Sequence, residues 1–579
     1  MRVFFISAAV LCALRPLAAQ DTAIVIHPES AGLHFVPPEL PHSTVLEVVR
    51  FYNAPSTTRL VGRASLPAGN AWRGDVAIRN GPALIAGHVE GSLLVINGNA
   101  VLDSTATVTG SLTVVGGTVI GPRGGLSGTV RVYAEPLPYR LAGDTLVYAQ
   151  DLLRRLSLSA RYTFGNATSR SSLVLATSGT FNRVEGLPIV AGPLVDLSLG
   201  RGLGFHGAAM GVFRTAHSIS GECCDLGYHT RAELVFGNRR PVGLTLRAFD
   251  LVNPVEDWGL HANEVGWEAF LVRRDYRDYY RGSGVAARLG WRAEAPLDLS
   301  FEIRREREST LRTRNPWTLS RTSIPWRPNP AIDNGHYTIL APSITLDSRN
   351  NADEPTSGWY LRGSLDFLMS DDVRPAPDFP STVRDSATML GTYRSTRGFF
   401  DLRRYNKLSP QGRLNFRFIL AGWLGGDPLP LQRRVSIGGP EPLPGYEFRQ
   451  GACNALASTG SFAGTLVAAC DRVVAVQTEY RGHVNLRTNY NPETGQTGGL
   501  GYMTRFLRGP DFVVFGDAGQ GWLVGHGPGL VPSGQLPRLS SWLADLGLGI
   551  DWGGFGVYVA KAVNSSQPVR LTARLEHRF

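Results

Sequence analysis

Apolar and polar residues alternate through much of the second part of the chain, most clearly at its end. From Val569 to Phe579 every second residue is apolar except His577, with polar or charged residues between them. The same alternation recurs upstream, at 156–164, 361–367, 414–420 and 474–480. Alternation over about ten residues is typical of a tilted strand that crosses a membrane, with lipid on one side and water on the other. A soluble β-sandwich alternates as well, so the periodicity alone leaves that fold open.

A repeat of short apolar strands fills residues 61–140. Gly74, Gly91, Gly110 and Gly128 each open one copy, at spacings of 17, 19 and 18 residues. A period near 18 residues predicts a β-solenoid with three short faces per coil, in which each coil buries its inward side chains against the next. A small Gly-rich β-sandwich is the alternative. The repeat resembles the β-helical domain of bactofilins, a family of polymer-forming bacterial scaffold proteins.

The N-terminus has the layout of a secretory signal peptide. Arg2 precedes an apolar stretch over 3–14, and Ala18-Ala19 supplies small residues for cleavage. An N-terminal membrane anchor is the alternative, although the apolar run is much shorter than the ~20 residues of a spanning helix. The segment from there to the end of the repeat shows no amphipathic helical period.

These patterns predict an all-β protein, a 16-stranded antiparallel transmembrane β-barrel preceded by a short periplasmic β-solenoid. We expect a signal peptide at 1–19, a lead-in at 20–60, the solenoid at 61–140 and the barrel at 150–579. The last segment is long enough for sixteen strands of about ten residues with loops between them. The net charge of +10 is spread along the chain. Without a basic run or a zinc-finger spacing, it does not indicate a nucleic-acid partner.

Four short motifs follow one another along the barrel segment. Their residues are Phe181–Leu187; Asp347, Arg349, Pro355 and Gly358; Gly438, Gly439, Gly445 and Tyr446; and Phe515, Asp517 and Gly519. In order and spacing they resemble the motifs of the BamA/TamA superfamily of outer-membrane barrels, the bacterial surface antigen type. The resemblance implies that the loop at 438–446 folds into the barrel and that the wall at 515–519 receives it. Terminal Phe579 resembles the C-terminal signature of Gram-negative outer-membrane barrels.

The loop departs from the family pattern at one position. The family carries an arginine just before the Gly-Tyr dipeptide, and here that position is Pro444. If Asp517 shares a face with Phe515 it points into the lumen, where an ionised carboxylate is costly unless it finds a cation. Arg449 is near enough in sequence to replace the missing arginine. We therefore predict that Arg449 pairs with Asp517 and pins the loop, the alternative being that Asp517 is solvated in the lumen.

The cysteines outside the signal peptide are even in number, which permits disulfides in an exported chain. Cys453 and Cys470 follow the loop motif directly. This position favours a bridge between them that closes an extension of the same loop, worth about 3 kcal/mol. Adjacent Cys223 and Cys224 are either a strained pair or two free thiols.

The resemblance implies a protein that assists insertion or translocation of polypeptides into or across the outer membrane. Family members collect clients by strand addition on periplasmic POTRA repeats, and here the solenoid stands in their place. Lateral opening between the first strand and the strand ending at Phe579 would expose an edge for client strands. Two other functions stay open: a passive pore or outer-membrane anchor for a solenoid scaffold, and a barrel enzyme.

The sequence contains no G-x-S-x-G, H-E-x-x-H or P-loop pattern, and its histidines lack metal-ligand spacing. We therefore expect no catalytic, cofactor-binding or metal-binding residues. The expected partners are the outer-membrane lipid bilayer and unfolded outer-membrane or secreted polypeptides. Self-association or an envelope partner is expected at the solenoid. The expected location is the outer membrane, with the N-terminal domain in the periplasm.

Overall fold

The computed structural model describes residues 24–27, 32–35, 42–117, 119–122, 125–133, 137, 139–142, 145–148, 159–165, 169–177, 180–200, 203–216, 226–236, 242–292, 297–320, 325–349, 355–376, 392–409, 411–451, 453, 455–456, 466–484, 510–552, 555–563, 565–575 and 577–578. The chain forms two compact units, one largely from His34–Phe164 and the other largely from Thr177–Phe579. The predicted signal peptide, the pair Cys223 and Cys224, and Phe579 lie outside the described residues.

The first unit contains a β-solenoid made of three parallel sheets. One sheet has the order β14-β12-β9-β6-β3, the second β13-β10-β7-β4 and the third β11-β8-β5. The strands are β3 (Thr58–Val61), β4 (Ala64–Leu66), β5 (Ala71–Arg73), β6 (Val76–Arg79), β7 (Ala83–Ile85), β8 (His88–Glu90), β9 (Leu93–Ile96), β10 (Ala100–Leu102), β11 (Thr107–Val108), β12 (Leu112–Val115), β13 (Val119–Ile120) and β14 (Val130–Tyr133). The predicted β-solenoid is therefore confirmed.

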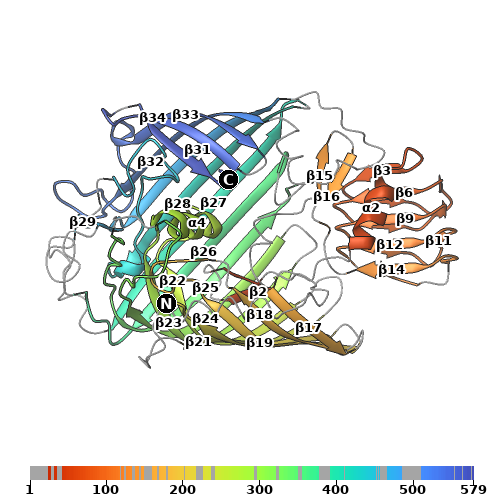
Figure 1. The fold of residues 1–579 in the computed structure, drawn as a ribbon, viewed down its shortest axis with the longest axis horizontal. Coiled ribbons are helices and arrows are strands. Elements are labelled where there is room, and N and C mark those ends of the chain that lie inside the picture. The colour runs from red at the N-terminus through yellow and green to blue at the C-terminus, as the bar shows by residue number, and fades with distance from the viewer. Residues whose placement is uncertain are drawn as a thin grey trace. The chain divides into compact units, whose positions relative to one another are not determined.

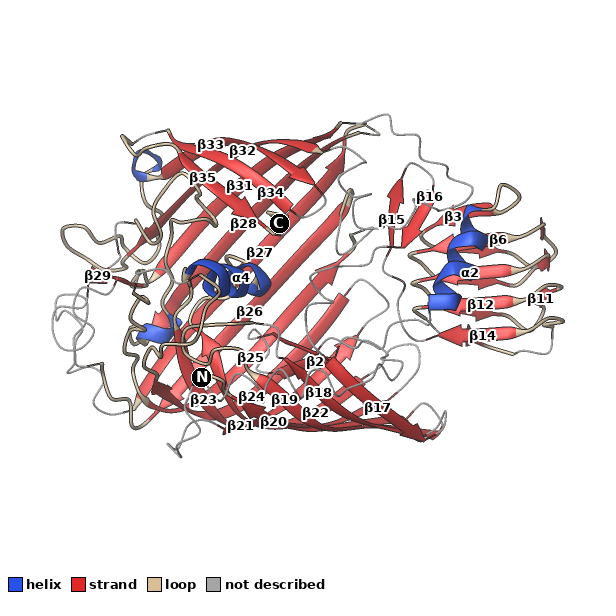
Figure 2. Ribbon diagram, in the orientation of Figure 1, coloured by secondary structure: helices blue, strands red, loops and turns tan. Residues whose placement is uncertain are grey.

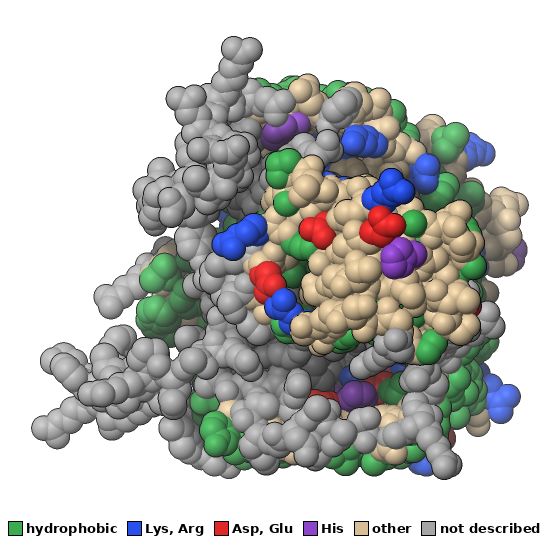
Figure 3. Space-filling view, turned by 90° about the vertical axis from the view of Figure 1, so that its right-hand side faces the viewer, with side chains coloured by type: hydrophobic (Ala, Val, Ile, Leu, Met, Phe, Trp, Pro, Cys, Tyr) green, Lys and Arg blue, Asp and Glu red, His purple; other side chains and the backbone are tan. Residues whose placement is uncertain are grey.

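Equivalent side chains of successive coils stack in the solenoid core. Val76 pairs in register with Leu93, and Leu93 with Leu112, and all three are buried. Gly91 stands where two coils approach closely, because a Cβ atom there would lie 2.4 Å from the carbonyl oxygen of Gly74. The glycine spacing in the sequence thus marks the corners at which the backbones touch. Figure 3 shows charged side chains of both signs scattered over the solenoid surface, among backbone and small polar groups.

A helix precedes the solenoid, so the expectation that this region lacks an amphipathic helix is wrong. In α2 (His42–Asn53), Val45, Val48 and Tyr52 are buried. They pack with residues such as Leu94 on the outer face of the first solenoid sheet. Their spacing of three and four residues is the helical signal, obscured by β-branched residues that also suit strands. The helix covers the second face of that sheet, which is why all four residues of β9 are buried.

The chain also forms two short strand pairs. They are β1 (Ile24–His27) with β2 (Gly32–Phe35), and β15 (Tyr139–Ala142) with β16 (Thr145–Tyr148). The side-chain amide of Asn53, at the end of α2, donates to the backbone oxygen of Leu146 at 2.7 Å. The same side chain accepts from the Leu146 N–H at 2.8 Å. These bonds hold the end of the helix against β16.

The large sheet follows the order of the chain. Its strands are β17 (Ser159–Gly165), β18 (Ser169–Thr177), β19 (Ile189–Gly200), β20 (Leu203–Phe213), β21 (Leu226–Phe236), β22 (Val242–Pro254), β23 (Tyr279–Arg292), β24 (Leu297–Thr310), β25 (Gly335–Asp347), β26 (Gly358–Ser370), β27 (Tyr393–Lys407), β28 (Gly412–Gly426), β31 (Arg472–His483), β32 (Asp511–Trp522), β33 (Leu543–Trp552), β34 (Phe555–Ala562) and β35 (Arg570–Arg574). The sixteen strands from β18 to β35 are the predicted all-β barrel sheet, and β17 adds a further strand at its beginning.

Short elements interrupt the connections between these strands. They are helix α4 (Ala262–Val272), the 3₁₀ turns η4 (Leu431–Arg433) and η6 (Leu539–Ser541), and the strand pair β29 (Ala455–Leu456) and β30 (Leu466–Val467). In Figures 1 and 2 the sheet curves around α4, which lies between its last strands and β20–β22. No helix in the described part of the chain has the length and apolar composition needed to cross a bilayer.

Exposure alternates along the strands as the sequence pattern predicts. In β31, Val476 and Tyr480 are 37% and 40% exposed, whereas Gln477 and Glu479 are buried, and on β32 Asp517 is buried as well. The outward face is therefore apolar, as lipid requires, and the inward face carries the polar groups. Asp517 does point into the lumen.

The last strand is shorter than the predicted alternation over 569–579. β35 ends at Arg574, and the described residues beyond it, such as His577 and Arg578, are not in a strand. Their side chains bind inside the sheet, where His577 Nδ1 lies 3.0 Å from Asp551 Oδ2. The alternation thus breaks after β35, because the adjacent side chains of His577 and Arg578 both bind partners inside the sheet.

Candidate functional site: a loop folded into the barrel

The connection between β28 and β31 folds inward and is mostly buried. We call its first part, Asp427–Gly451, the luminal loop. Ile437, Leu443 and Tyr446 are each at most 3% exposed. They pack in one apolar cluster with Ile419 of β28 and Val473 of β31. The residues expected to form an inward-folded loop are therefore placed inside the sheet.

Two glycines reverse the direction of the luminal loop. Gly438 and Gly439 have φ angles of 100° and 115°, a region that side chains with a Cβ rarely adopt. The loop then folds back on itself, and the Arg449 N–H donates to the Gly438 oxygen at 3.1 Å. This turn places Arg449 beside Ser436, with Arg449 Nε 3.3 Å from Ser436 Oγ.

The luminal loop contacts the wall formed by β32 and β33. The Gly445 N–H donates to Asp545 Oδ2 at 2.6 Å, and the Tyr446 hydroxyl donates to the Ala544 oxygen at 3.1 Å. A Cβ atom on Gly445 would lie 2.7 Å from the Cβ of Asp545, so the approach requires glycine. A Cβ atom on Gly519 would lie 2.6 Å from Ile437 Cδ1. The wall motif thus receives the loop through Gly519.

The predicted pairing of Arg449 with Asp517 is wrong. Arg449 Nη2 lies 2.9 Å from Glu256 Oε2, and its Nη1 pairs with Asp278. Asp517 instead pairs with Arg578, whose guanidinium lies 3.7 Å from the ring centroid of Phe515. The turn at the two glycines directs Arg449 toward the segment between β22 and β23, while β32 lies beside the C-terminal tail. The alternation over 569–579 places Arg578 among its polar, inward-facing positions, and this was the sequence signal for it.

Asp278 joins the luminal loop to the motif at 181–187. Arg183 Nη2 and Arg327 Nη2 lie 2.8 Å and 2.6 Å from Asp278 Oδ1, and Arg449 binds the other carboxylate oxygen. Burial by itself would raise the pKa of Asp278, but Arg327, Arg449 and Arg183 hold this pKa well below its usual range. Asp278 is therefore an ionised buried hub, and sequence reasoning missed it because its partners come from distant loops.

Glu441 forms a second buried hub at the centre of the luminal loop. Its carboxylate lies 3.1 Å from Arg417 Nη1 and 2.8 Å from Arg574 Nη1. Burial would raise the pKa of Glu441, but Arg574 and Arg417 lower it below its usual value. Arg417 also lies 2.8 Å from Asp401 Oδ2 on β27. The hub thus connects the loop to β27, β28 and β35.

A third contact fixes the beginning of the luminal loop. Arg433 Nη2 lies 3.2 Å from Glu306 Oε1 and also pairs with Glu308, both on β24. All three side chains are at most 8% exposed. Arg433, Glu441 and Arg449 together hold the loop against widely separated parts of the sheet. Such charges are stable in a buried place because each has an opposite partner.

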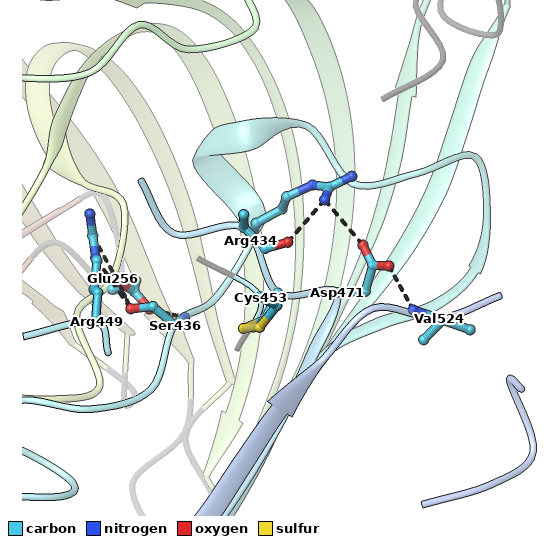
Figure 4. Close-up of a disulfide and its surroundings, with 9 residues drawn as sticks. Glu256, Arg434, Ser436, Arg449, Cys453, Asp471 and Val524 are labelled. Atoms are coloured by element: carbon cyan, nitrogen blue, oxygen red, sulfur yellow. Dashed lines mark hydrogen bonds and ion pairs between the residues drawn. A yellow bond between two sulfur atoms is a disulfide. The ribbon is translucent and has the colours of Figure 1, made fainter. Parts of the chain in front are cut away.

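The structure contains the predicted disulfide between Cys453 and Cys470 (Figure 4). Their Cα atoms are 5.0 Å apart, and both sulfurs lie over Gly521 on β32. Next to the bridge, Arg434 Nη1 lies 3.5 Å from Asp471 Oδ1, and Asp471 Oδ2 accepts from the Val524 N–H at 2.9 Å. The bridge therefore joins the segment after the luminal loop to the residues just before β31, next to β32.

Replacing both Cys453 and Cys470 with serine is expected to lower the free energy of unfolding by about 3 kcal/mol. The bridge joins residues separated by 17 positions, and the loss is that of loop closure in the unfolded chain. Urea unfolding of the protein in lipid vesicles measures it. Wild-type protein treated with reductant is the matched control and should lose the same amount. An unchanged unfolding midpoint in the double variant contradicts the prediction.

The described residues of the motif from Asp347 to Gly358 lie where β25 ends and β26 begins. Arg349 Nε and Nη2 bind the two carboxylate oxygens of Asp347 at 2.8 Å and 2.7 Å. Gly358 has a φ angle of 113°, and a Cβ atom there would lie 2.3 Å from the Ser348 oxygen. Pro355 is buried. The motif thus holds the end of β25 against the start of β26, where the Trp359 N–H donates to Ser348 Oγ at 3.0 Å.

Fold and site together define a transmembrane-type β-barrel whose interior holds an inward-folded, ionically anchored loop. Residues 227–525 match the model of the Omp85 superfamily domain. The match spans more than half of the chain, so the protein belongs to the Omp85 superfamily. This membership confirms the resemblance that the motifs indicated.

Solved structures and curated proteins were also compared with the chain. It is similar to BamA from Haemophilus ducreyi lacking POTRA domains 1–3, with 13% identity, a TM-score of 0.41, and coverage of 72% of this chain and 74% of that chain. It is similar to CdiB from Acinetobacter baumannii, with 11% identity, a TM-score of 0.28 and coverage of 73% and 66%. It is also similar to CdiB from Escherichia coli, with 10% identity, a TM-score of 0.29, and coverage of 71% of this chain and 62% of that chain. No curated protein matches the chain.

Proposed function

We propose that this protein inserts polypeptides into the outer membrane or translocates them across it, using the outer edge of β35 as the place where client strands pair. One observation carries the proposal. The backbone N–H of Leu575, directly after β35, donates to the side chain of Glu264 at 2.8 Å rather than to a neighbouring strand. A strand edge held by a side chain can exchange that partner for a strand, since an unpaired edge attracts one.

The size of the last strand supports the same proposal. β35 spans five residues, whereas β27 and β28 span fifteen each. In the described residues β35 pairs with β34 alone. Each ladder bond adds to the cost of separating two strands, so a short edge strand is the easiest place to open the sheet.

The filled interior favours this proposal over a passive pore. A pore needs a water-filled path, whereas the luminal loop extends from β24 at Arg433 to β33 at Gly445. The loop is held by buried ion pairs that would each have to break to clear the lumen. We therefore assign the loop the role of keeping the wall rigid while the edge of β35 opens.

In this proposal the N-terminal segments serve delivery and client handling. The signal peptide at 1–19 directs export, and the lead-in at 20–60 and the solenoid at 61–140 lie in the periplasm before the barrel at 150–579. The solenoid then takes the place of POTRA repeats as the platform that clients meet first. Insertion by strand exchange requires no covalent chemistry by the protein.

The test is the rate at which an unfolded model outer-membrane protein inserts into liposomes that contain the folded protein. Faster insertion than into liposomes with an unrelated porin is expected. Equal rates in the two kinds of liposome would overturn the proposal and favour a pore or an anchor. The porin controls for simple disruption of the bilayer.

A cross-link shows where insertion takes place. Cys223 and Cys224 are first replaced with serine, and Leu175→Cys and Leu571→Cys are then joined by thiol-reactive linkers long enough to span β17, which pairs with β18 at the end of the sheet. Both leucines face outward on β18 and β35. This link should abolish the acceleration. The matched control joins Val559→Cys to Leu571→Cys, register partners on β34 and β35, and should leave the acceleration intact.

A further inference from the structure

Helix α4 touches both the end of β35 and the turn that follows β18. On one side Glu264 binds β35 and the residue after it. On the other side Gly266 packs against the turn that follows β18, where a Cβ atom would lie 3.1 Å from the backbone nitrogen of Phe181. Phe270 extends this second contact, with its ring centroid 5.4 Å from that of Phe181. Figure 2 shows the helix between these parts of the sheet.

One carboxylate oxygen makes the contact with β35. Glu264 Oε1 lies 2.7 Å from Arg574 Nε and accepts the Leu575 N–H at 2.8 Å. The side chains of Glu264 and Arg574 are 2% and 3% exposed. The Leu575 N–H comes directly after the last residue of β35, and this carboxylate, not another strand, accepts its hydrogen bond.

We propose that α4 is a displaceable latch on the edge of β35, released when a client strand takes the place of Glu264. This inference rests on the proposed function and adds a regulatory element to it. The helix and the client compete for the same backbone donor, so the edge is protected until a client arrives. Protection of this kind prevents unspecific pairing at an open edge.

The contacts of the latch favour release over permanent closure. Glu264 Oε2 and Arg574 Nη2 are buried without a hydrogen-bond partner in the described part of the chain. Unsatisfied buried groups weaken the closed arrangement. Arg574 also keeps Glu441 of the luminal loop as a partner at 2.8 Å when Glu264 leaves. The guanidinium is therefore not left as a buried charge without a counter-ion after release.

Hydrogen–deuterium exchange of the full chain in liposomes tests the latch directly. In Glu264→Ala, exchange in the segment 570–579 should rise about tenfold or more, since a hydrogen bond to a charged group is lost. Glu264→Gln keeps an acceptor oxygen and should give a smaller rise. Glu268→Ala, one turn further along α4, is the matched control and should exchange like wild type. Equal exchange in all variants overturns the latch.

The insertion assay and the client then separate this inference from the proposed function. Glu264→Ala should accelerate insertion by the same factor by which it raises exchange in 570–579, because the variant populates the open edge. Unfolded client added to wild type should raise exchange in 262–272. If wild type does not accelerate insertion but the client raises this exchange, the proposed function fails and the latch stands. If insertion is accelerated but the exchange in 262–272 does not respond to client, the latch fails and the function stands.

Discussion

Replacing Arg449 with methionine is expected to lower the free energy of unfolding by about 3–5 kcal/mol. The guanidinium is completely buried, and its removal leaves Glu256 without a cation it now binds at 2.9 Å and Asp278 with one cation fewer. Loss of one partner from a buried ion pair costs this much because the other charge stays desolvated. Urea unfolding in lipid vesicles measures the change. A loss below about 1 kcal/mol, the value for an exposed pair, contradicts it.

Double-mutant cycles locate the partner of Arg449. Combining Arg449→Met with Asp278→Asn should show a coupling free energy of about 0.5–3 kcal/mol, because the two side chains are in contact. Combining it with Asp517→Asn should be additive within about 0.5 kcal/mol, since Asp517 pairs with Arg578. Coupling to Asp517 and additivity with Asp278 would restore the pairing predicted from the sequence.

Replacing Arg417 with methionine is expected to release the centre of the luminal loop and to lower the free energy of unfolding by about 3–5 kcal/mol. Arg417 binds Asp401 and Glu441 and donates to the Trp258 oxygen at 3.0 Å. Its removal leaves two buried carboxylates with fewer donors. The free energy of unfolding should fall, and the rate of tryptic cleavage after Arg433 and Arg434 should rise.

Arg570→Met is the matched control for Arg417→Met. Arg570 also pairs with the luminal loop, through Glu447 at 2.6 Å, but these side chains are 28% and 66% exposed. Solvent screens such a pair, so a loss below about 1 kcal/mol and an unchanged cleavage rate are expected. Equal effects of the two substitutions would show that burial does not decide the strength of these contacts.

The strands and the solenoid were predictable because their signals are local. Alternation along β31 and the glycine corners at Gly74 and Gly91 depend on residues close in sequence, and burial follows directly from them. The disulfide between Cys453 and Cys470 was predictable from its place after the loop motif. Helix α2 was missed although its spacing is local, since valines at apolar positions suit a strand as well as a helix.

The partners of buried charges could not be predicted. Arg449 and Asp278 are 171 positions apart, and Arg574 and Glu264 are 310 apart. Sequence shows that such groups face the lumen, but many opposite charges share that interior. The backbone turn at Gly438 and Gly439 decides which of them Arg449 reaches. Proximity in sequence pointed to Asp517 through the family motif, and geometry selected Asp278.

The sequence by itself determined the all-β class, the membrane-facing alternation, the solenoid and the family, because each depends on periodicity or on short ordered motifs. Only the tertiary structure decided that α4 lies against β35 and that the luminal loop is held by Arg433, Glu441 and Arg449. The physical reason is that a buried charge must find an opposite partner. That partner is fixed by how distant strands and loops meet.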